Sequence, residues 1–196
     1  MALAFGVTDA AVRGPALGIL EVSTISRGIV VADAGLKRAP AVLLHSRAIS
    51  GGKHLVMFEG GVAEVEEAMA AAKLVAGDQL LDVVELSNAD DQVWPLLEAP
   101  VTRAWDPSAE AVAIIETKTV CAAIAAVDAS VKVADVVVRD TRFAVDLAGK
   151  AYFTITGTLD SIEAAVSAAR AAADQQVVNI ETIAQPAPEL AGMLFR

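Results

Sequence analysis

The sequence is short of basic residues and contains no long apolar run. Its 196 residues include 15 Lys and Arg against 25 Asp and Glu, which gives a formal net charge of −10. Nucleic-acid binding needs a basic face that replaces counterions on phosphate, so we expect no nucleic-acid partner. Charges interrupt every apolar run before it reaches the roughly 20 residues that span a bilayer. Because the N-terminus also lacks a signal-peptide pattern, we expect a cytoplasmic protein with no membrane partner.

Residues that carry catalytic or metal chemistry are also scarce. The single cysteine, Cys121, excludes an intramolecular disulfide, and the surrounding VCAAIAAV predicts that it is buried in a helix. His45 and His54 have no Cys, Asp or Glu at metal-ligand spacing, so we interpret both as strand residues and predict no metal site. The Gly-Gly-Lys at 51–53 lacks the spacing of a phosphate-binding loop. With no nucleophile beside a base and no carboxylate pair, the sequence predicts no catalytic residue and a protein that is not an enzyme.

Apolar residues are abundant, at 55% of the chain, and their arrangement occurs twice. Two stretches, 44–60 and 137–157, each contain Gly-Lys, an alternating run and a closing Gly. The glycines of the two Gly-Lys pairs, Gly52 and Gly149, are 97 positions apart. Such self-similarity predicts a tandem duplication of a domain of about 95 residues, and two small apolar domains predict burial at subunit contacts. Three further pairs repeat at an offset of 95: Glu21 and Glu116, Asp33 and Asp128, and Lys37 and Lys132.

The predicted organisation is an N-terminal extension over 1–14, a first domain over 15–98, a linker over 99–110 and a second domain over 111–196. In the first domain the patterns predict strands at 16–22, 42–46, 53–58 and 80–86, with helices at 26–39 and 62–77. In the second they predict strands at 111–116, 135–140, 150–156 and 177–183, with helices at 119–134 and 159–173. A short helix follows each domain. The order β-α-β-β-α-β is the split pattern of ferredoxin-like α/β sandwiches, an α+β arrangement.

Several short motifs within these domains resemble those of bacterial microcompartment shell proteins. The first domain carries Ala16-Leu17-Gly18 with Glu21, Asp33-Ala34 with Lys37, Gly52-Lys53, and Gly60-Gly61-Val62. The second carries Glu116, Asp128-Ala129 with Lys132, Gly149-Lys150, and Gly157. The resemblance covers about 16 to 185 and rests on the combination and order of these motifs.

The resemblance implies two tandem BMC domains, each with a four-stranded antiparallel sheet and helices. Because the first domain begins with the Ala-Leu-Gly strand, the chain is similar to the unpermuted, trimeric T-type shell protein of propanediol-utilisation compartments. Such a homotrimer forms a pseudo-hexagonal tile whose central pore passes small polar metabolites, and it joins hexameric and pentameric shell proteins in the shell. Stacking of two trimers stays open. We expect no catalysis in such a tile.

The resemblance also assigns residues to the pore and to the tile edge. Lys37 and Lys132 correspond to the lysine through which tiles meet, and the alternative for both is an ordinary solvated helix lysine. The alternative for Asp146 is a turn residue bonded to its own backbone. The residues implied at the pore are Ile49, Ser50, Gly51 and Gly52 of the first domain and Asp146, Leu147, Ala148 and Gly149 of the second.

Ser50 departs from the pattern of the propanediol-utilisation relative. There the matching position is a cysteine that helps to hold an iron–sulfur cluster on the three-fold axis. A serine hydroxyl is a poor substitute for a thiolate, so we expect no cofactor in this protein. Two alternatives to a plain facet tile follow from the sequence. One is a redox shell protein that carries an iron–sulfur cluster, and the other is a ferredoxin-like sensor that binds a small molecule between its repeats.

Overall fold

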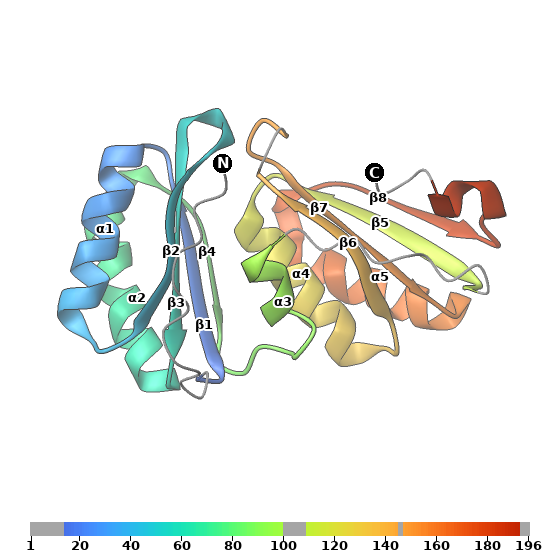
Figure 1. The fold of residues 1–196 in the computed structure, drawn as a ribbon, viewed down its shortest axis with the longest axis horizontal. Coiled ribbons are helices and arrows are strands. Elements are labelled where there is room, and N and C mark those ends of the chain that lie inside the picture. The colour runs from blue at the N-terminus through green and yellow to red at the C-terminus, as the bar shows by residue number, and fades with distance from the viewer. Residues whose placement is uncertain (1–13, 100–108, 145–146, 193–196) are drawn as a thin grey trace.

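The computed structural model describes residues 14–99, 109–144 and 147–192, and within them the chain folds into two domains of the same topology (Figure 1). Residues 1–13 of the predicted extension, 100–108 of the predicted linker, Asp146 and the tail beyond 192 lie outside the described residues. Both domains follow the predicted order β-α-β-β-α-β with a short helical segment at the end.

The first domain contains β1 (Ala16–Val22), α1 (Ile25–Arg38), β2 (Val42–Ile49), β3 (Lys53–Gly60), α2 (Val62–Ala76), β4 (Leu80–Leu86) and the short α3 (Trp94–Glu98). The second contains β5 (Ala111–Thr117), α4 (Val120–Val133), β6 (Val137–Phe143), β7 (Ala151–Gly157), α5 (Leu159–Ala173), β8 (Val177–Ala184) and a 3₁₀ turn at Pro188–Gly192. The sheet orders are β2-β3-β1-β4 and β6-β7-β5-β8, and every pairing is antiparallel. This is the ferredoxin-like order that the sequence predicts.

Two strands end three residues later than predicted, and the second of them, β6, also begins two residues later than predicted, at Val137. β2 continues past the predicted end at Ser46 to Ile49, and β6 continues past Asp140 to Phe143. In both cases pairing with the following strand persists up to the loop, with Ile49 opposite Lys53 and Phe143 opposite Ala151. Cross-strand pairing therefore extends both strands over short segments of mixed polarity, 47–49 and 141–143.

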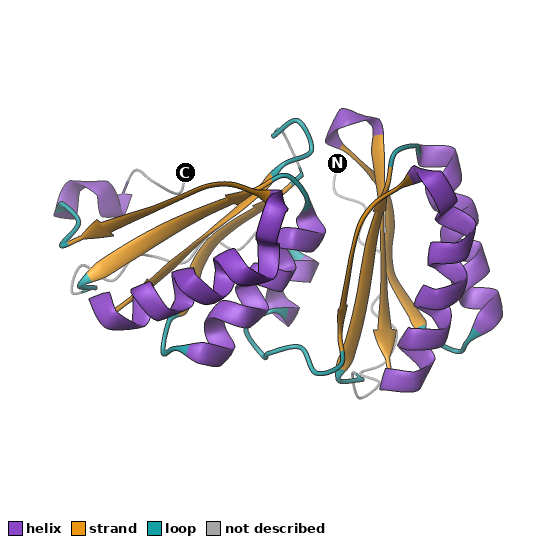
Figure 2. Cartoon of the chain, turned by 180° about the vertical axis from the view of Figure 1, so that it is seen from behind, coloured by secondary structure: helices purple, strands orange, loops and turns teal. Residues whose placement is uncertain are grey.

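The ends of the helices follow the local sequence. Thr119 caps α4, because its side-chain oxygen accepts a hydrogen bond from the backbone N–H of Ala122. Gly77 ends α2 with φ of 57°, a left-handed conformation that glycine adopts without steric cost. These caps place the four helices against one face of their own sheets, as Figure 2 shows.

The two sheets differ in how many of their faces are covered. Strand β1 is buried along its whole length, because α1 and α2 pack on one face of the first sheet and α3 and α4 pack on the other (Figures 1 and 2). Helix α4 therefore lies between the two sheets, which explains its nearly continuous apolar sequence and the complete burial of Cys121. Among the described residues, only the turn at 188–192 covers part of the far face of the second sheet, through contact of Leu190 with Val112.

Candidate functional site

The two predicted pore loops lie side by side at one end of the folded molecule. The first loop, Ser50–Gly52, is a single 3₁₀ turn in which Gly51 and Gly52 have φ of 81° and 75°. The backbone N–H of Ser50 donates to the carbonyl of Ala144 at 3.2 Å, next to the second loop. A Cβ atom on Gly149 would lie 2.7 Å from the Ser50 carbonyl oxygen, so glycine is required there by close approach as well as by its φ of 83°.

The predicted rim residues differ in exposure. Gly51, Gly52 and Ala148 are exposed, and Ser50 is half-buried, as is Leu147. The side chain of Ile49 is only 8% exposed and belongs to the core between the domains, so it supports the first loop from behind. Gly149 is buried against the first loop. Asp146 lies outside the described residues, and the structure gives no placement for it.

A buried carboxylate joins the domains directly beneath the loops. Glu21 on β1 is fully buried, and Lys53 Nζ lies 3.2 Å from its Oε2 atom. The Oε1 atom of Glu21 accepts hydrogen bonds from the backbone N–H groups of Val120 and Cys121, in the first turn of α4. Burial raises the pKa of Glu21, although Lys53 and the two N–H donors act in the opposite direction. We call this arrangement the inner clamp.

Lys53 extends the inner clamp to the second loop and to the turn before α4. Its ammonium group donates to the carbonyl of Lys118 at 3.3 Å and to the carbonyl of Gly149 at 3.1 Å. Sequence reasoning found Glu21 and Lys53 as repeated motif residues but assigned neither a role. Their main-chain partners are 65 to 100 positions away, which no side-chain motif could have indicated.

The second domain carries the same pair without the helix. Glu116 lies opposite Tyr152 and Asn179, as Glu21 lies opposite Leu55 and Asp82, so the two carboxylates occupy one register. Lys150 Nζ lies 3.7 Å from Glu116, and the Glu116 side chain remains 44% exposed. A hollow of about 380 Å³ opens here, lined by Glu116, Leu147, Ala148, Lys150, Ala151 and Tyr152.

Comparison with known proteins decides the family. The family model of the BMC domain matches residues 16–89 and again residues 111–186. The chain belongs to the BMC-domain family. It is 34% identical over 173 residues to the bacterial microcompartment shell protein PduT of Citrobacter freundii, a match that covers 88% of this chain and 92% of that protein. The protein is therefore a structural shell protein of a bacterial microcompartment.

Solved structures support the same assignment. The crystal structure of a microcompartment protein from Desulfitobacterium hafniense superimposes with a TM-score of 0.72 at 32% identity, over 89% of this chain and 97% of that one. The fused permuted hexameric shell protein MSM0275 of the RMM microcompartment gives a TM-score of 0.60 at 23% identity, over 80% of this chain and 79% of that one, and shows a shared fold. BMC shell proteins assemble with other shell proteins to build the shell.

The two lysines predicted at the tile edge have different surroundings in the BMC domains. Lys37 pairs with Asp33 one turn earlier in α1 at 2.6 Å, and both side chains are exposed. Lys132 reaches Asp128 at 2.6 Å and also donates to the carbonyl of Asn88 in the first domain at 2.6 Å. Asp128 is nearly buried and accepts a hydrogen bond from the backbone N–H of Asp90. The Asp128–Lys132 pair thus joins the two BMC domains, whereas Asp33–Lys37 contacts only its own helix.

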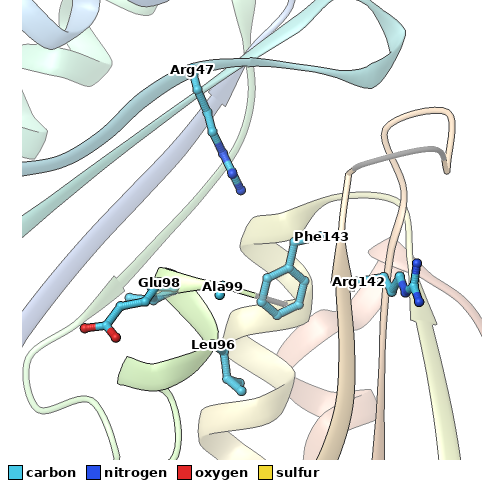
Figure 3. Close-up of a pocket in the computed structure, with 7 residues that line it drawn as sticks. Arg47, Leu96, Glu98, Ala99, Arg142 and Phe143 are labelled. Atoms are coloured by element: carbon cyan, nitrogen blue, oxygen red, sulfur yellow. The ribbon is translucent and has the colours of Figure 1, made fainter. Parts of the chain in front are cut away.

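A pocket of about 120 Å³ lies between the BMC domains beside the short helix α3. Figure 3 shows Arg47 reaching from β2 toward Leu96 and Phe143, which form its apolar wall. Arg142 occupies the equivalent position on β6 and also lines the pocket, although its guanidinium points away from Phe143 (Figure 3). Burial lowers the pKa of Arg47 from its usual value. The pocket is therefore lined by two arginines and Glu98 around an apolar surface.

The two histidines lie in strands and share no metal-binding cluster. Over 14–99, 109–144 and 147–192, no three His, Cys, Asp or Glu side chains are grouped so that they could hold a metal ion. His54 is buried with its Nε2 atom 2.8 Å from Ser46, and His45 Nε2 lies 2.7 Å from the carbonyl of Leu97, so both histidines are strand residues as predicted. None of the helices described here has the length and hydropathy to cross a bilayer.

Proposed function

We propose that three copies of this chain close into a pseudo-hexagonal tile of the microcompartment facet, with the two pore loops of each copy around a central opening. The supporting observation is that, in the described part of the chain, a helix packs on the far face of the first sheet but not on the far face of the second. The far face of the first sheet is covered by α4, while the far face of the second sheet lacks an equivalent helix in the described part of the chain. A second copy can supply that helix, and three copies close the ring.

The exposed residues of α1 match this requirement. Ile29 on α1 is 58% exposed, while its counterpart on α4, Ile124, is fully buried against the first sheet. Ile25 is likewise exposed where its counterpart Val120 is fully buried. The face of α1 that would dock on a second sheet is therefore apolar and uncovered, as expected of a heterologous contact that closes a ring.

The opening suits small polar solutes. The first loop consists of the half-buried Ser50 and two exposed glycines, which would offer a hydroxyl group and main-chain polar groups to the opening. The second loop adds Leu147 and Ala148, and Asp146 remains a candidate from the sequence. We propose passage of small polar metabolites through this rim and no catalysis by the tile. The tile would act in the cytoplasm within the compartment shell, beside hexameric and pentameric shell proteins and without nucleic-acid or membrane partners.

The molar mass in solution tests the tile directly. We expect light scattering coupled to size exclusion to give the mass of three chains at micromolar concentration. A monomer under those conditions would contradict the proposal, because a ring of six domains needs three chains.

A charge reversal tests the edge assignment of Lys37. Lys37→Asp is expected to leave the trimer intact and to abolish sheet formation by purified protein, because the long apolar stem and the charge of an edge lysine both support lateral contact. Unchanged sheets in electron micrographs would show that Lys37 is a solvated helix residue. Lys132, which also donates to Asn88, is expected to respond less cleanly because its loss disturbs the joint between the domains.

The loops do not suit an iron–sulfur cluster. Clusters are held by thiolates, the chain has one cysteine, and Cys121 is fully buried in the core between the domains with a pKa raised by burial. If three copies of Ser50 meet at the axis, Ser50→Cys gathers three thiols there. We expect Ser50→Cys to take up iron and visible absorbance on anaerobic reconstitution, and wild type and Ala122→Cys to take up neither. Equal uptake by wild type and Ser50→Cys, or no uptake by Ser50→Cys, would contradict the axial position of Ser50.

A further inference from the structure

In the described part of the chain, the first turn of α1 has backbone donors without acceptors, and Glu116 accepts no hydrogen bond, although Lys150 lies 3.7 Å away. Within the described part of the chain, the backbone N–H groups of Ile25 and Ser26 have no hydrogen-bond partner. Their counterparts on α4, those of Val120 and Cys121, donate to Glu21. Free N–H groups at a helix N-terminus carry partial positive charge and attract carboxylates.

We propose that the hollow of about 380 Å³ at Glu116 and Lys150 is a socket for the first turn of α1 of a second copy of this chain, with Glu116 accepting the N–H groups of Ile25 and Ser26 of that copy. This outer clamp repeats the inner clamp atom for atom. The inference rests on the proposed trimer and names the polar contact that holds its subunits together.

The remaining partners of the outer clamp follow from the same correspondence. Lys53 donates to the carbonyls of Lys118 and Gly149, whose counterparts are Ser23 and Gly52. Lys150 therefore reaches the carbonyls of Ser23 and Gly52 in the neighbouring copy. Within the chain, the ammonium group of Lys150 makes no hydrogen bond to the described residues and stands 3.7 Å from Glu116, so it is free to do so.

The caps of the two helices support the same arrangement. Thr119 donates its hydroxyl proton to Asp82 of the first sheet, and its oxygen accepts from Ala122. Thr24 makes no capping bond and donates instead to Gln79 of its own domain at 2.6 Å. Asn179 occupies the position of Asp82 on the second sheet and is exposed. Docking brings Thr24 of one copy to Asn179 of the next.

The socket selects a helix start rather than a free anion. Glu116 is a carboxylate and repels anions, and the neighbouring walls are small or apolar at Leu147, Ala148 and Ala151. A cation alone would leave the apolar walls at Leu147, Ala148 and Ala151 without a partner. A second copy supplies main-chain donors, apolar surface and matching carbonyls together, which is the combination already present inside the chain.

The test compares variants that remove one donor or one charge. Ile25 is the first residue of α1, where proline fits a helix, and Thr24 before it is extended with φ of −136° and ψ of 145°, as a residue before proline prefers. Ile25→Pro therefore removes one N–H group without breaking the helix, and Ile25→Ala controls for the lost side chain. Glu116→Gln removes the charge at nearly constant shape, and Glu163→Gln on the exposed side of α5 is its control.

Sedimentation of the full-length variants measures the trimer dissociation constant, with circular dichroism as a check on folding. We expect Glu116→Gln to raise that constant at least about tenfold over Glu163→Gln, and Ile25→Pro at least about tenfold over Ile25→Ala, because charge-assisted hydrogen bonds are strong. The double variant Ile25→Pro with Glu116→Gln should raise the trimer dissociation constant over that of wild type by a factor smaller than the product of the two single factors. Trimers that are equally stable in all variants would overturn the outer clamp and leave the tile intact, whereas a wild-type monomer would overturn the tile itself.

Discussion

The two domains fill the space between sheet and helices in different ways. In the first domain the strand supplies a large side chain and the helix a glycine, whereas in the second the strand residue is smaller and the helix residue larger. In the first, a Cβ atom on Gly35 would lie 2.4 Å from the ring of Phe58, so only glycine fits on the helix. In the second, the equivalent helix residue is Ser130 and the strand residue is Ile155, both fully buried. Gly28 beneath the ring of His54 is likewise replaced by Ala123 above Ala151.

The polar anchors behave differently from the core pairs. Volume can move from a strand to a helix without loss of packing, because dispersion contacts depend on filled space rather than on which residue fills it. A carboxylate that accepts helix N–H groups has no such substitute, and both domains retain Glu followed by Gly-Lys at the same register. The comparison shows that core volume differs between the domains, while the carboxylate that accepts helix N–H groups in the first domain keeps its identity in the second.

Breaking the inner clamp is expected to have the largest effect. Glu21→Ala leaves Lys53 and two N–H groups of α4 without their carboxylate, and loss of one partner of a buried pair costs about 3–5 kcal/mol. Urea unfolding should show this loss, and Glu66→Ala on the exposed face of α2 should show almost none. A loss of less than about 1 kcal/mol would mean that the clamp is incidental to stability.

Moving one residue of the second core into the first is expected to have the next largest effect. Gly35→Ser forces a side chain against Phe58 and should cost about 1–3 kcal/mol through overpacking. Adding Phe58→Ile, which completes the pair found in the second domain, should recover most of that loss. Thermal unfolding of the single and double variants measures the coupling, and purely additive effects would contradict compensation between these positions.

The two helix ion pairs give a smaller contrast. Lys132→Met removes donors from Asn88 and from the nearly buried Asp128, and should cost about 1–3 kcal/mol. Lys37→Met removes an exposed pair and should cost about 0–0.5 kcal/mol. Equal losses in chemical unfolding would show that Lys132 does not join the domains.

The smallest expected effect is a pH dependence of the free energy of unfolding that arises from His54 in the first domain. Burial lowers the pKa of His54 in the folded chain, so the unfolded chain binds more protons once the pH falls below the ordinary value of about 6.5. Stability contributed by His54 is therefore present above that pH and is lost as the pH falls toward the lowered value.

A swap to the pair of the second domain tests this assignment. The double variant Gly28→Ala with His54→Ala reproduces Ala123 and Ala151 and should flatten the free energy of unfolding between pH 7.5 and pH 5 relative to wild type. Parallel curves for the two proteins would show that another group carries the dependence.

The order of elements could be predicted because each one has a local cause. Alternating strands, helical stripes and the glycines at 51–52 and 77 are visible in short windows, and β1, β4 and α5 have the predicted bounds. The ends of β2 and β6 could not be predicted, because pairing with a neighbouring strand extends them over short segments of mixed polarity. The BMC family, and with it the shell function, followed from ordered motifs.

The candidate site was predictable only in part. The paired glycines of the first loop could be recognised from the sequence as a turn, and both have positive φ in the structure. The burial of Ile49 was not predicted, because it depends on the second domain packing behind the loop. The partners of Glu21 and the pocket beneath Arg47 depend on contacts between domains, which a pattern within one repeat does not contain.

Fusion of the two domains has a consequence for how the rim can change. In a ring built from identical single domains, every substitution at the rim is copied into each sector, so a residue that favours one solute must also tolerate neighbours of its own kind on both sides. Here Ser50 and Gly51 belong to one loop, and Leu147 and Ala148 belong to another that touches it. In the proposed trimer, a mutation at Ser50 would enter alternate sectors only, while the loops of the second domain would keep their own residues. Such a trimer could thus acquire chemistry of three-fold symmetry without redesign of the remaining half of its rim.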